Sequence, residues 1–357
     1  MKRTLFAVNI FLLLSPLFAQ VPSFTYRGQG QGEDEEFIKS FDSLQKEKQN
    51  NPLSKRSALF KNIDMVQFVN DGNLFDTYTI GEDCQSYTAK RYVKNFSINR
   101  YETTYELWYA VKCQAEKKGY VFANPGQEGS MGRRGKAPSS ENSLQPVTEI
   151  SWYDAIVWCN ALSELYGKKP CYTYQKKVLR DSSNTAFCDL AECDWEADGY
   201  RLPTESEWEY AARKTSSSFQ NGDSVSGQVN KKGFTDKNIP EGDLAWYFEN
   251  TKESKRVATC GSPFSKDTAL LSGDGNPNAC GLFDMCGNVL EFCWDWEANY
   301  ENVKTGESYY GPKTGFSRIS RGGSWSQYTP FIYTGDRYSY DPNEHYNYFG
   351  FRICSSK

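Results

Sequence analysis

The sequence contains a single histidine, His345, among its 357 residues. One imidazole cannot supply a His-ligated metal triad, a zincin helix or any chemistry that needs paired histidines. The eleven cysteines include no C-x-x-C pair, the spacing typical of a structural zinc site. These absences argue against most metal enzymes, and we predict no metal, no cofactor and no catalytic residue.

Excess charge of one sign is also missing. There are 41 Lys and Arg against 45 Asp and Glu, giving a net charge of -4, and no basic run stands out. The electrostatic field of so small a net charge argues against a nucleic-acid partner.

Long apolar runs are limited to the start of the chain. Lys2 and Arg3 precede an apolar stretch at residues 4–19, which is shorter than the about 20 residues of a membrane span. This pattern predicts a signal peptide at residues 1–19, cleaved after Ala19. Gln20 stands where a lipoprotein would have cysteine, so we expect no lipid anchor and no transmembrane segment. The mature protein is predicted to be exported, at the cell surface, secreted or periplasmic.

Cysteines in an exported chain suggest disulfides. Cys171 with Cys188 or Cys193 flanks a polar insertion and is a candidate staple, whereas Cys159 fits a small buried hydrophobe. The remaining pairings stay open.

Residues 20–64 are polar and charged, which predicts a linker or arm, and residues 65–357 have a globular composition. Within the linker, only Phe37, Ile38, Phe41 and Leu44 are spaced for one short helix.

Capping boxes predict the starts of three helices in the globular part. They pair Thr103 with Glu106, Ser151 with Asp154, and Thr204 with Glu207. After Ser151 an apolar stripe follows helical spacing, and Gly167 is a natural stop; the stripe comprises Ala155, Trp158, Cys159, Leu162 and Leu165.

Six segments occur in a recognisable order. They are residues 96–104 (FSINRYETT), 146–155 (PVTEISWYDA), 199–213 (GYRLPTESEWEYAAR), 281–291 (GLFDMCGNVLE), 321–325 (RGGSW) and 350–352 (GFR). In these motifs the chain resembles the formylglycine-generating-enzyme (sulfatase-modifying factor) family. The resemblance implies an α+β, C-type-lectin-like fold, loop-rich with a few helices and small antiparallel sheets. Fold alone does not settle function.

The chemistry implied by the family is missing from this sequence. Active members use a cysteine pair after the Arg-Gly-Gly-Ser motif to bind copper and oxidise a substrate cysteine, because soft thiolates hold Cu(I). Gln327 and Ile332 stand near those positions. Another branch uses three histidines on iron, which one histidine cannot supply.

Other polar residues in the motifs fit either a functional role, in metal binding or catalysis, or a structural role. The family also carries calcium near residues 281–291, where Asp284 and Glu291 offer oxygen ligands. We favour instead that Asp284, Asn288 and Glu291 bond to neighbouring backbone in a tight loop. Buried structural pairing is likewise the preferred interpretation of four motif residues that resemble catalytic groups, namely Arg201, Glu207, Arg321 and Arg352.

Function is expected in residues 326–349, the Tyr-rich segment. It holds six tyrosines, whereas 24 in 357 residues would predict fewer than two. Tyrosine with small polar residues is typical of recognition loops, because Tyr gives rigid amphipathic contact and its neighbours give adaptable hydrogen bonds. A self-packed loop or edge strand is the alternative.

A second resemblance supports recognition. Variable proteins of diversity-generating retroelements, in particular those of spirochaetes, share this fold and place a diversified stretch between Arg-Gly-Gly-Ser-Trp and Gly-Phe-Arg. Their diversification rewrites adenines, chiefly in Asn codons, from which Tyr, Ser, Thr, Asp, His, Gly, Ile and Phe are reachable. Most of residues 326–349 belong to that set.

We therefore expect a non-catalytic protein that binds a protein or glycan ligand, such as one on another cell surface. The alternative is a pseudoenzyme or structural module that binds peptide or glycan at the former active cleft. The predicted contact residues are Ser326, Gln327, Tyr328, Thr329, Phe331, Tyr333, Asp336, Tyr338, Tyr340, Asp341, Asn343, His345, Tyr346, Asn347 and Tyr348.

Because Gln327 and Ile332 replace the thiolates, the purified protein should contain no stoichiometric copper and should not oxidise a cysteine peptide. Metal analysis together with a peptide-oxidation assay checks this. One equivalent of copper with turnover would contradict it.

Overall fold

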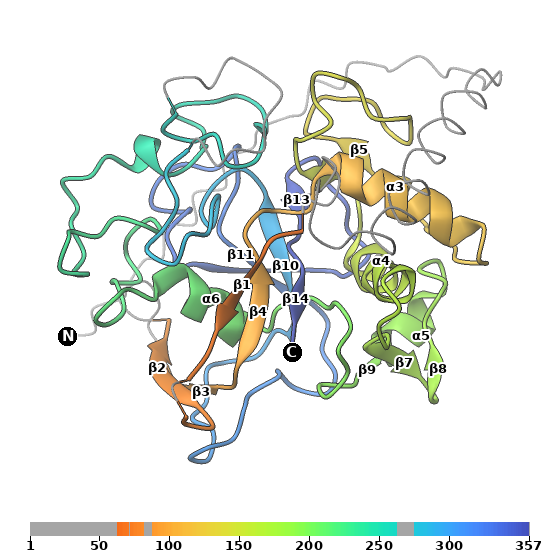
Figure 1. Ribbon diagram of the computed structural model, residues 1–357, viewed down its shortest axis with the longest axis horizontal. Helices are drawn as coiled ribbons and strands as arrows, with labels where there is room; N and C mark the ends of the chain where they lie inside the picture. Colours follow the sequence, from red (N-terminus) through yellow and green to blue (C-terminus); the bar gives the residue numbers. More distant parts are fainter. Residues whose placement is uncertain (1–62, 71, 82–87, 263–274, 357) are drawn as a thin grey trace, which may run out of the picture.

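The computed structural model describes residues 63–70, 72–81, 88–262 and 275–356, with short helices and strands joined by long loops (Figure 1). The predicted signal peptide, nearly all of the predicted arm and Cys84 lie outside these residues. The α+β, loop-rich prediction is confirmed. The helices are α3 (Tyr105–Glu116), α4 (Trp152–Leu165), α5 (Thr185–Asp189), α6 (Glu205–Arg213) and the 3-10 turn η1 (Glu241–Asp243).

The largest sheet has the strand order β12-β11-β10-β13. Its strands are β10 (Leu290–Trp296), β11 (Arg318–Arg321), β12 (Arg337–Tyr340) and β13 (Phe349–Gly350). β11 pairs antiparallel with both β10 and β12, whereas β13 is parallel to β10. This sheet carries both ends of the Tyr-rich segment, because β11 ends just before it and β13 begins at its last residue.

Both faces of β10 are covered, so all seven of its residues are buried. Side chains alternate across a strand. Leu290, Phe292 and Trp294 join the core around α3 and α4, and Cys293 joins the second core around α6. Figure 1 accordingly shows α6 on one side of β10 and α3 and α4 on the other.

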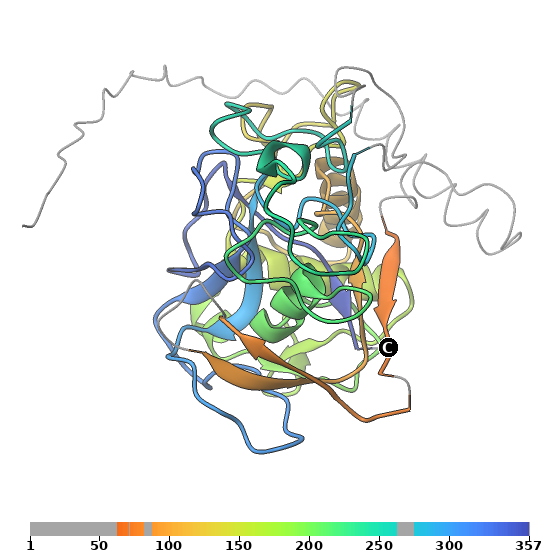
Figure 2. The same ribbon diagram turned by 90° about the vertical axis from the view of Figure 1, so that its left-hand side faces the viewer.

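Smaller sheets complete the domain. In the three-stranded sheet β1-β4-β14, the last strand lies beside the first part of the domain. Figure 2 shows the blue loops that follow β11 along one edge of the molecule and β1 along the opposite edge. The strands are β1 (Met65–Phe68), β2 (Asp76–Ile80), β3 (Ala89–Val93), β4 (Phe96–Asn99), β5 (Gln127–Glu128), β6 (Val147–Thr148), β7 (Tyr172–Tyr174), β8 (Lys177–Val178), β9 (Glu192–Cys193) and β14 (Cys354–Ser355).

Two of the predicted capping boxes are confirmed. Ser151 with Asp154 caps α4, and Thr204 with Glu207 caps α6, each with both reciprocal hydrogen bonds. The third was misplaced by one residue, because Thr104 caps α3 by accepting from Leu107 N at 3.3 Å. The Thr103 backbone is still extended there, bonded to Phe351 and Val147.

The stop predicted for α4 is confirmed, and four residues of the predicted stripe, Ala155, Trp158, Cys159 and Leu162, are fully buried, whereas Leu165 is half-buried. The burial is wider than one stripe, because every residue from Trp152 to Ser163 is buried. Gly167 has a φ of 67°, the left-handed conformation typical of a helix end.

The proposed disulfide staple is wrong, because Cys171, Cys188 and Cys193 are free thiols. Hydrogen bonds hold this insertion instead. β7 pairs with β9, and the Asn160 side chain bonds to Tyr172 N and to the Tyr172 carbonyl at 2.9 and 2.7 Å. Burial raises the pKa of Cys171 to about 11 and that of Cys188 to about 12, so both are protonated at neutral pH.

The cap of α6 gives a stability prediction. Thr204→Ala should lower the free energy of unfolding by about 0.5–2 kcal/mol, because Glu207 N loses its acceptor. Chemical denaturation measures this, and Thr204→Ser, which keeps the hydroxyl, is the matched control. An unchanged midpoint for Thr204→Ala would show that this cap adds no stability.

Candidate recognition surface

The Tyr-rich segment leaves the central sheet at two glycines. Gly322 and Gly323 follow β11 with φ values of 93° and 69°, in the left-handed region that favours glycine. A Cβ on Gly323 would lie 2.7 Å from Ile332 Cγ2 and from the Phe331 carbonyl oxygen. Glycine therefore lets the chain fold back against residues 331–332.

The middle of the segment is anchored in the interior. Ile332 is fully buried in a small core with Val225, Leu244, Ala245 and Cys286. Buried Thr334 donates from its N and Oγ1 to the Ser224 carbonyl at 3.0 and 3.1 Å. Gly335 N donates to the Gly222 carbonyl at 2.8 Å. The backbone here is held by a loop more than a hundred residues earlier.

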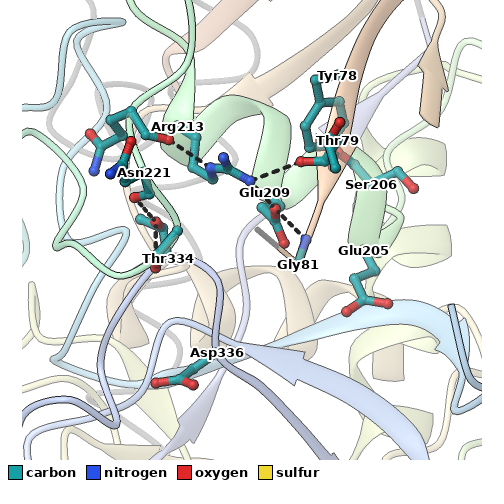
Figure 3. A network of polar contacts seen from close by, with 12 residues as sticks. Tyr78, Thr79, Gly81, Glu205, Ser206, Glu209, Arg213, Asn221, Thr334 and Asp336 are labelled. Carbon is teal, nitrogen blue, oxygen red and sulfur yellow. Dashed lines mark hydrogen bonds and ion pairs between the residues drawn. The ribbon is translucent and has the colours of Figure 1, made fainter. Parts of the chain in front are cut away.

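A buried charge network holds the same stretch from beneath. Arg321, at the end of β11, contacts the Glu209 carboxylate of α6 and donates to the Thr334 carbonyl at 3.1 Å. Its other terminal nitrogen contacts the Asp336 carbonyl. Glu209 also pairs with Arg213 at 2.6 Å and accepts from Gly81 N at 2.9 Å (Figure 3).

Electrostatics explain why this network keeps Arg321 charged. Burial alone would lower the pKa of the guanidinium. Glu209, Tyr300 and Glu205 outweigh that effect and raise the pKa above its ordinary value. A charge without solvent must be paired, so β11, α6 and the Tyr-rich segment are held in one arrangement.

β12 is fixed by a second ion pair. Arg337 donates from Nε and Nη2 to the two oxygens of Glu205, each at 2.9 Å, and lies 4.3 Å over the Tyr300 ring. Side chains alternate along a strand, so Tyr338 and Tyr340 face the opposite side from Arg337.

Asp295 supports this pair from β10. Its Oδ2 accepts from Glu205 N at 2.7 Å. Burial, and next the charge of Glu205, raise the pKa of Asp295 to about 7.

Aromatic side chains of the segment form two groups joined by β12. In the first, Tyr328 packs on Phe248 with ring centroids 4.1 Å apart. Tyr338 Oη donates to the Phe331 carbonyl at 2.7 Å and ties β12 to this group. Lys252 Nζ lies 3.3 Å from the centroid of the Phe248 ring and adds a cation at its edge.

The second group surrounds buried Phe349. Tyr346 stacks on Tyr348 with centroids 5.2 Å apart, and Tyr340 meets the edge of Phe349 at 4.7 Å. The backbone below is fixed, because Glu149 N donates to the Tyr346 carbonyl at 3.1 Å.

The predicted contact residues are all at least partly accessible. The exposed ones are Tyr328, Phe331, Asp341, Asn343, His345 and Tyr346. The half-buried ones are Ser326, Gln327, Thr329, Tyr333, Asp336, Tyr338, Tyr340, Asn347 and Tyr348. Burial raises the pKa of Asp336 to about 6. Sequence reasoning missed Phe248 and Lys252, which come from a separate loop and carry no motif.

The positions of the family's cysteine pair have other roles. The Gln327 carbonyl accepts from Phe248 N at 2.9 Å, and Ile332 is a core residue. Cys286 lies in the same small core as Ile332, where burial raises the pKa of its thiol to about 12. A protonated thiol is a poor nucleophile and a poor copper ligand.

The preference for backbone partners over calcium is confirmed for Asp284 and Asn288 and is wrong for Glu291, whose partners are side chains. Asp284 Oδ2 accepts from Ala258 N at 2.6 Å, and Asn288 Oδ1 accepts from Lys255 N at 2.8 Å. The Glu291 carboxylate accepts from Arg352 at 2.6 and 2.7 Å and from Trp208 Nε1 at 2.8 Å. Among the described residues, no three or more His, Cys, Asp and Glu side chains form a group that could hold a metal ion.

The structural interpretation of the motif arginines is confirmed. Arg201 donates to both oxygens of Glu207 at 2.7 Å, and the pairs of Arg321 and Arg352 described above are equally buried. Within the same described ranges, none of the helices has the length and apolar character to span a membrane.

Comparisons with known proteins agree with this architecture. Residues 53–357 match the model of the sulfatase-modifying factor enzyme 1-like domain. The chain therefore belongs to this family, and the resemblance found in its motifs is confirmed.

Individual proteins and one solved structure are also similar to this chain. "Treponema denticola variable protein 1" superimposes with a TM-score of 0.60 and 28% identity over 83% of this chain and 95% of that one. "Chaperone protein LppX" of Paenibacillus barcinonensis is 31% identical over 250 residues, 67% of this chain and 73% of that protein. Mouse formylglycine-generating enzyme is 31% identical over 159 residues, 44% of this chain and only 37% of the enzyme.

The charge network makes a specific prediction. Glu209→Gln should lower the free energy of unfolding by about 3–5 kcal/mol, because Arg213 and Arg321 lose their shared anion. Denaturation curves measure the loss, and Glu307→Gln, at an exposed carboxylate, should shift stability by less than about 0.5 kcal/mol. Equal effects in the two variants would show that the network is dispensable.

Asp295 should make stability depend on pH. Its pKa is about 7 in the folded state and 3.8 without burial, so the folded state holds the proton more tightly. The contribution of Asp295 to the free energy of unfolding is fully present below pH 3.8 and is lost as the pH rises through 7. Asp295→Asn should remove this loss, so unfolding free energies measured at pH 5 and pH 8 should differ less than in the unsubstituted protein. Parallel pH profiles would contradict the assignment.

Proposed function

We propose that this chain is an exported, non-catalytic ligand-binding protein that uses residues 326–349 as a recognition surface. The observation that carries the proposal is that this segment combines residues bonded into the domain with residues accessible on its surface. Its backbone and its side chains at Ile332, Thr334 and Arg337 are bonded into the domain. Its tyrosines, Asp341, Asn343 and His345 remain at least partly accessible.

This division suits a surface whose side chains vary. Anchors fix the backbone, so an exposed side chain changes contacts with a ligand without changing the core. Tyr328 and Phe331 are 48% and 54% exposed, and Tyr346 is 39% exposed. Exposed aromatics clustered on one segment are typical of interaction sites. The similarity to the Treponema variable protein, 28% identical, supports the same interpretation.

The ligand class that fits is a protein or a glycan. Paired tyrosines offer flat apolar faces, and the carboxylates of Asp341 and Glu344 offer hydrogen-bond acceptors beside them. With the signal peptide predicted at residues 1–19, this contact would take place outside the cytoplasm.

A second candidate is a module that holds a polypeptide, favoured by the name of the Paenibacillus relative, "Chaperone protein LppX". In that case the partner would contact the positions of the family's cysteine pair, near Gln327 and Ile332. Ile332 is fully buried and does not contact a ligand, so we favour the surface made by the accessible tyrosines.

Replacement of two exposed tyrosines tests the proposal. Peptides selected from a random display library on the unsubstituted protein serve as the probe. Tyr328→Ala and Tyr346→Ala should each cost about 2 kcal/mol or more of binding free energy where they are central to the contact. Thermal stability should change by less than about 0.5 kcal/mol.

Phe316→Ala is the matched control, because Phe316 is an aromatic residue that is 96% exposed outside the segment. It should leave both binding and stability unchanged. A Tyr328→Ala/Tyr346→Ala double variant that unfolds, or that binds the selected peptides normally, would overturn the proposal.

A further inference from the structure

The two aromatic groups of the Tyr-rich segment differ in charge. The turn that follows β12 carries Asp341 and Glu344, and it is closed by Glu344 N, which donates to the Asp341 carbonyl at 3.0 Å. Asp341 is exposed and Glu344 is half-buried. Lys252 lies at the other group, against the Phe248 ring. The group around Phe349 therefore has two carboxylates on the turn beside it.

Glu344 lacks a counter-ion. Its Oε1 accepts from Tyr346 Oη at 3.4 Å, and among the described residues it forms no ion pair. Glu149, whose N donates to the Tyr346 carbonyl, is paired with Arg134 at 2.5 Å, so that arginine is already used. A half-buried carboxylate without a counter-ion favours a cation that a ligand brings.

The charge of Glu344 acts on three tyrosines. It is the largest cause of the raised pKa of Tyr346, and burial is the next. Burial raises the pKa of Tyr340 and of Tyr348, and the charge of Glu344 adds to both shifts. Negative charge beside a phenol disfavours its ionised form, so the electrostatic potential around these rings is negative.

A second pair of carboxylates extends this negative potential. Asp189 Oδ1 accepts from Tyr153 Oη at 2.7 Å. Burial, then Asp189 and Asp341, raise the pKa of Tyr153, so Asp341 lies near enough to act on the same hydroxyl. Within the described ranges neither aspartate forms an ion pair. A ligand with more than one positive charge would find a partner for each.

Accessible aromatic rings accompany the carboxylates. Tyr346 is 39% exposed and stacks on Tyr348 with planes 12° apart, and both rings meet Phe349 at steep angles of 61° and 73°. The three rings hold one another, so the exposed part of Tyr346 is fixed in place. The face of an aromatic ring attracts a cation within about 6 Å of its centroid. A cation placed there also lies close to the Glu344 carboxylate.

We propose that residues 340–348 bind a Lys or Arg side chain of a protein ligand. This inference rests on the proposed function, because it names the ligand chemistry of the same surface. The ammonium or guanidinium group lies on the Tyr346 ring and pairs with Glu344, and Asp341 is available to a second basic residue. Most glycans carry neutral or anionic groups, so the unpaired carboxylates favour a protein ligand.

Peptides selected from a random display library on the unsubstituted protein test this chemistry. Lys and Arg should be enriched in the selected peptides over the starting library. A selected peptide with arginine is then compared by titration calorimetry with its citrulline form, which has the same shape without the charge. The citrulline form should bind about tenfold more weakly. Glu344→Gln should bind the arginine form about tenfold more weakly and should no longer distinguish the two forms, because carboxylate and guanidinium act as a pair.

Glu307→Gln is the matched control, because it removes an exposed carboxylate outside the segment. It should distinguish arginine from citrulline as well as the unsubstituted protein does. Thermal unfolding of Glu344→Gln should match that of the unsubstituted protein, since glutamine keeps the size of the side chain.

The outcomes separate this inference from the proposed function. Selected peptides without enrichment of basic residues, or a Glu344→Gln variant that still distinguishes arginine from citrulline, would overturn the inference and leave the recognition surface standing. A neutral or acidic glycan on an array that binds through Tyr346, and equally well to Glu344→Gln, would do the same. Selected peptides that bind normally to the Tyr328→Ala/Tyr346→Ala double variant would overturn the recognition surface itself.

Discussion

Arg321 carries a full charge in the interior, and its partners come both from α6 and from the Tyr-rich segment. Glu209 and Glu205 extend from α6, while the Thr334 and Asp336 carbonyls belong to the segment itself. Leaving such a guanidinium unpaired would cost several kcal/mol, so strand, helix and segment must keep their relative positions. The same residue begins the motif RGGSW, whose two glycines let the chain fold back against residues 331–332.

Buried side chains that hold the backbone therefore alternate with accessible side chains within the Tyr-rich segment. Ile332 and Thr334 are buried between Phe331 and Tyr338, which are at least partly accessible, and Arg337 points back to Glu205 from the strand that carries Tyr338 and Tyr340. Tyr338, Tyr340 and Tyr348 are half-buried against the main core and combine support with contact surface. Under the proposed function, the residues that can change without disturbing the core are Tyr328, Asp341, Asn343, His345 and Tyr346, because they are exposed.

The fold and the limits of this segment were predictable because they are encoded in local motifs. The capping boxes at Ser151 and Thr204 act within one helical turn, and the RGGSW and GFR motifs flank the Tyr-rich segment. Thr104 was missed in favour of Thr103 because the backbone bonds that hold Thr103 outside the helix go to Val147 and Phe351, which are distant in the sequence. The contact of Phe248 with Tyr328, and the bond from Thr334 to Ser224, join distant residues without any periodic signal.

A saturation library over residues 326–349, sorted for resistance to protease, would test the central claim most directly. If buried anchors hold the backbone while the exposed side chains are free to vary, resistant clones should accept nearly any residue at positions 328, 341, 343, 345 and 346. They should retain Ile332, Thr334 and Arg337 or close substitutes. Uniform tolerance across the segment, or the loss of resistance whenever Tyr328 or Tyr346 is replaced, would contradict the account.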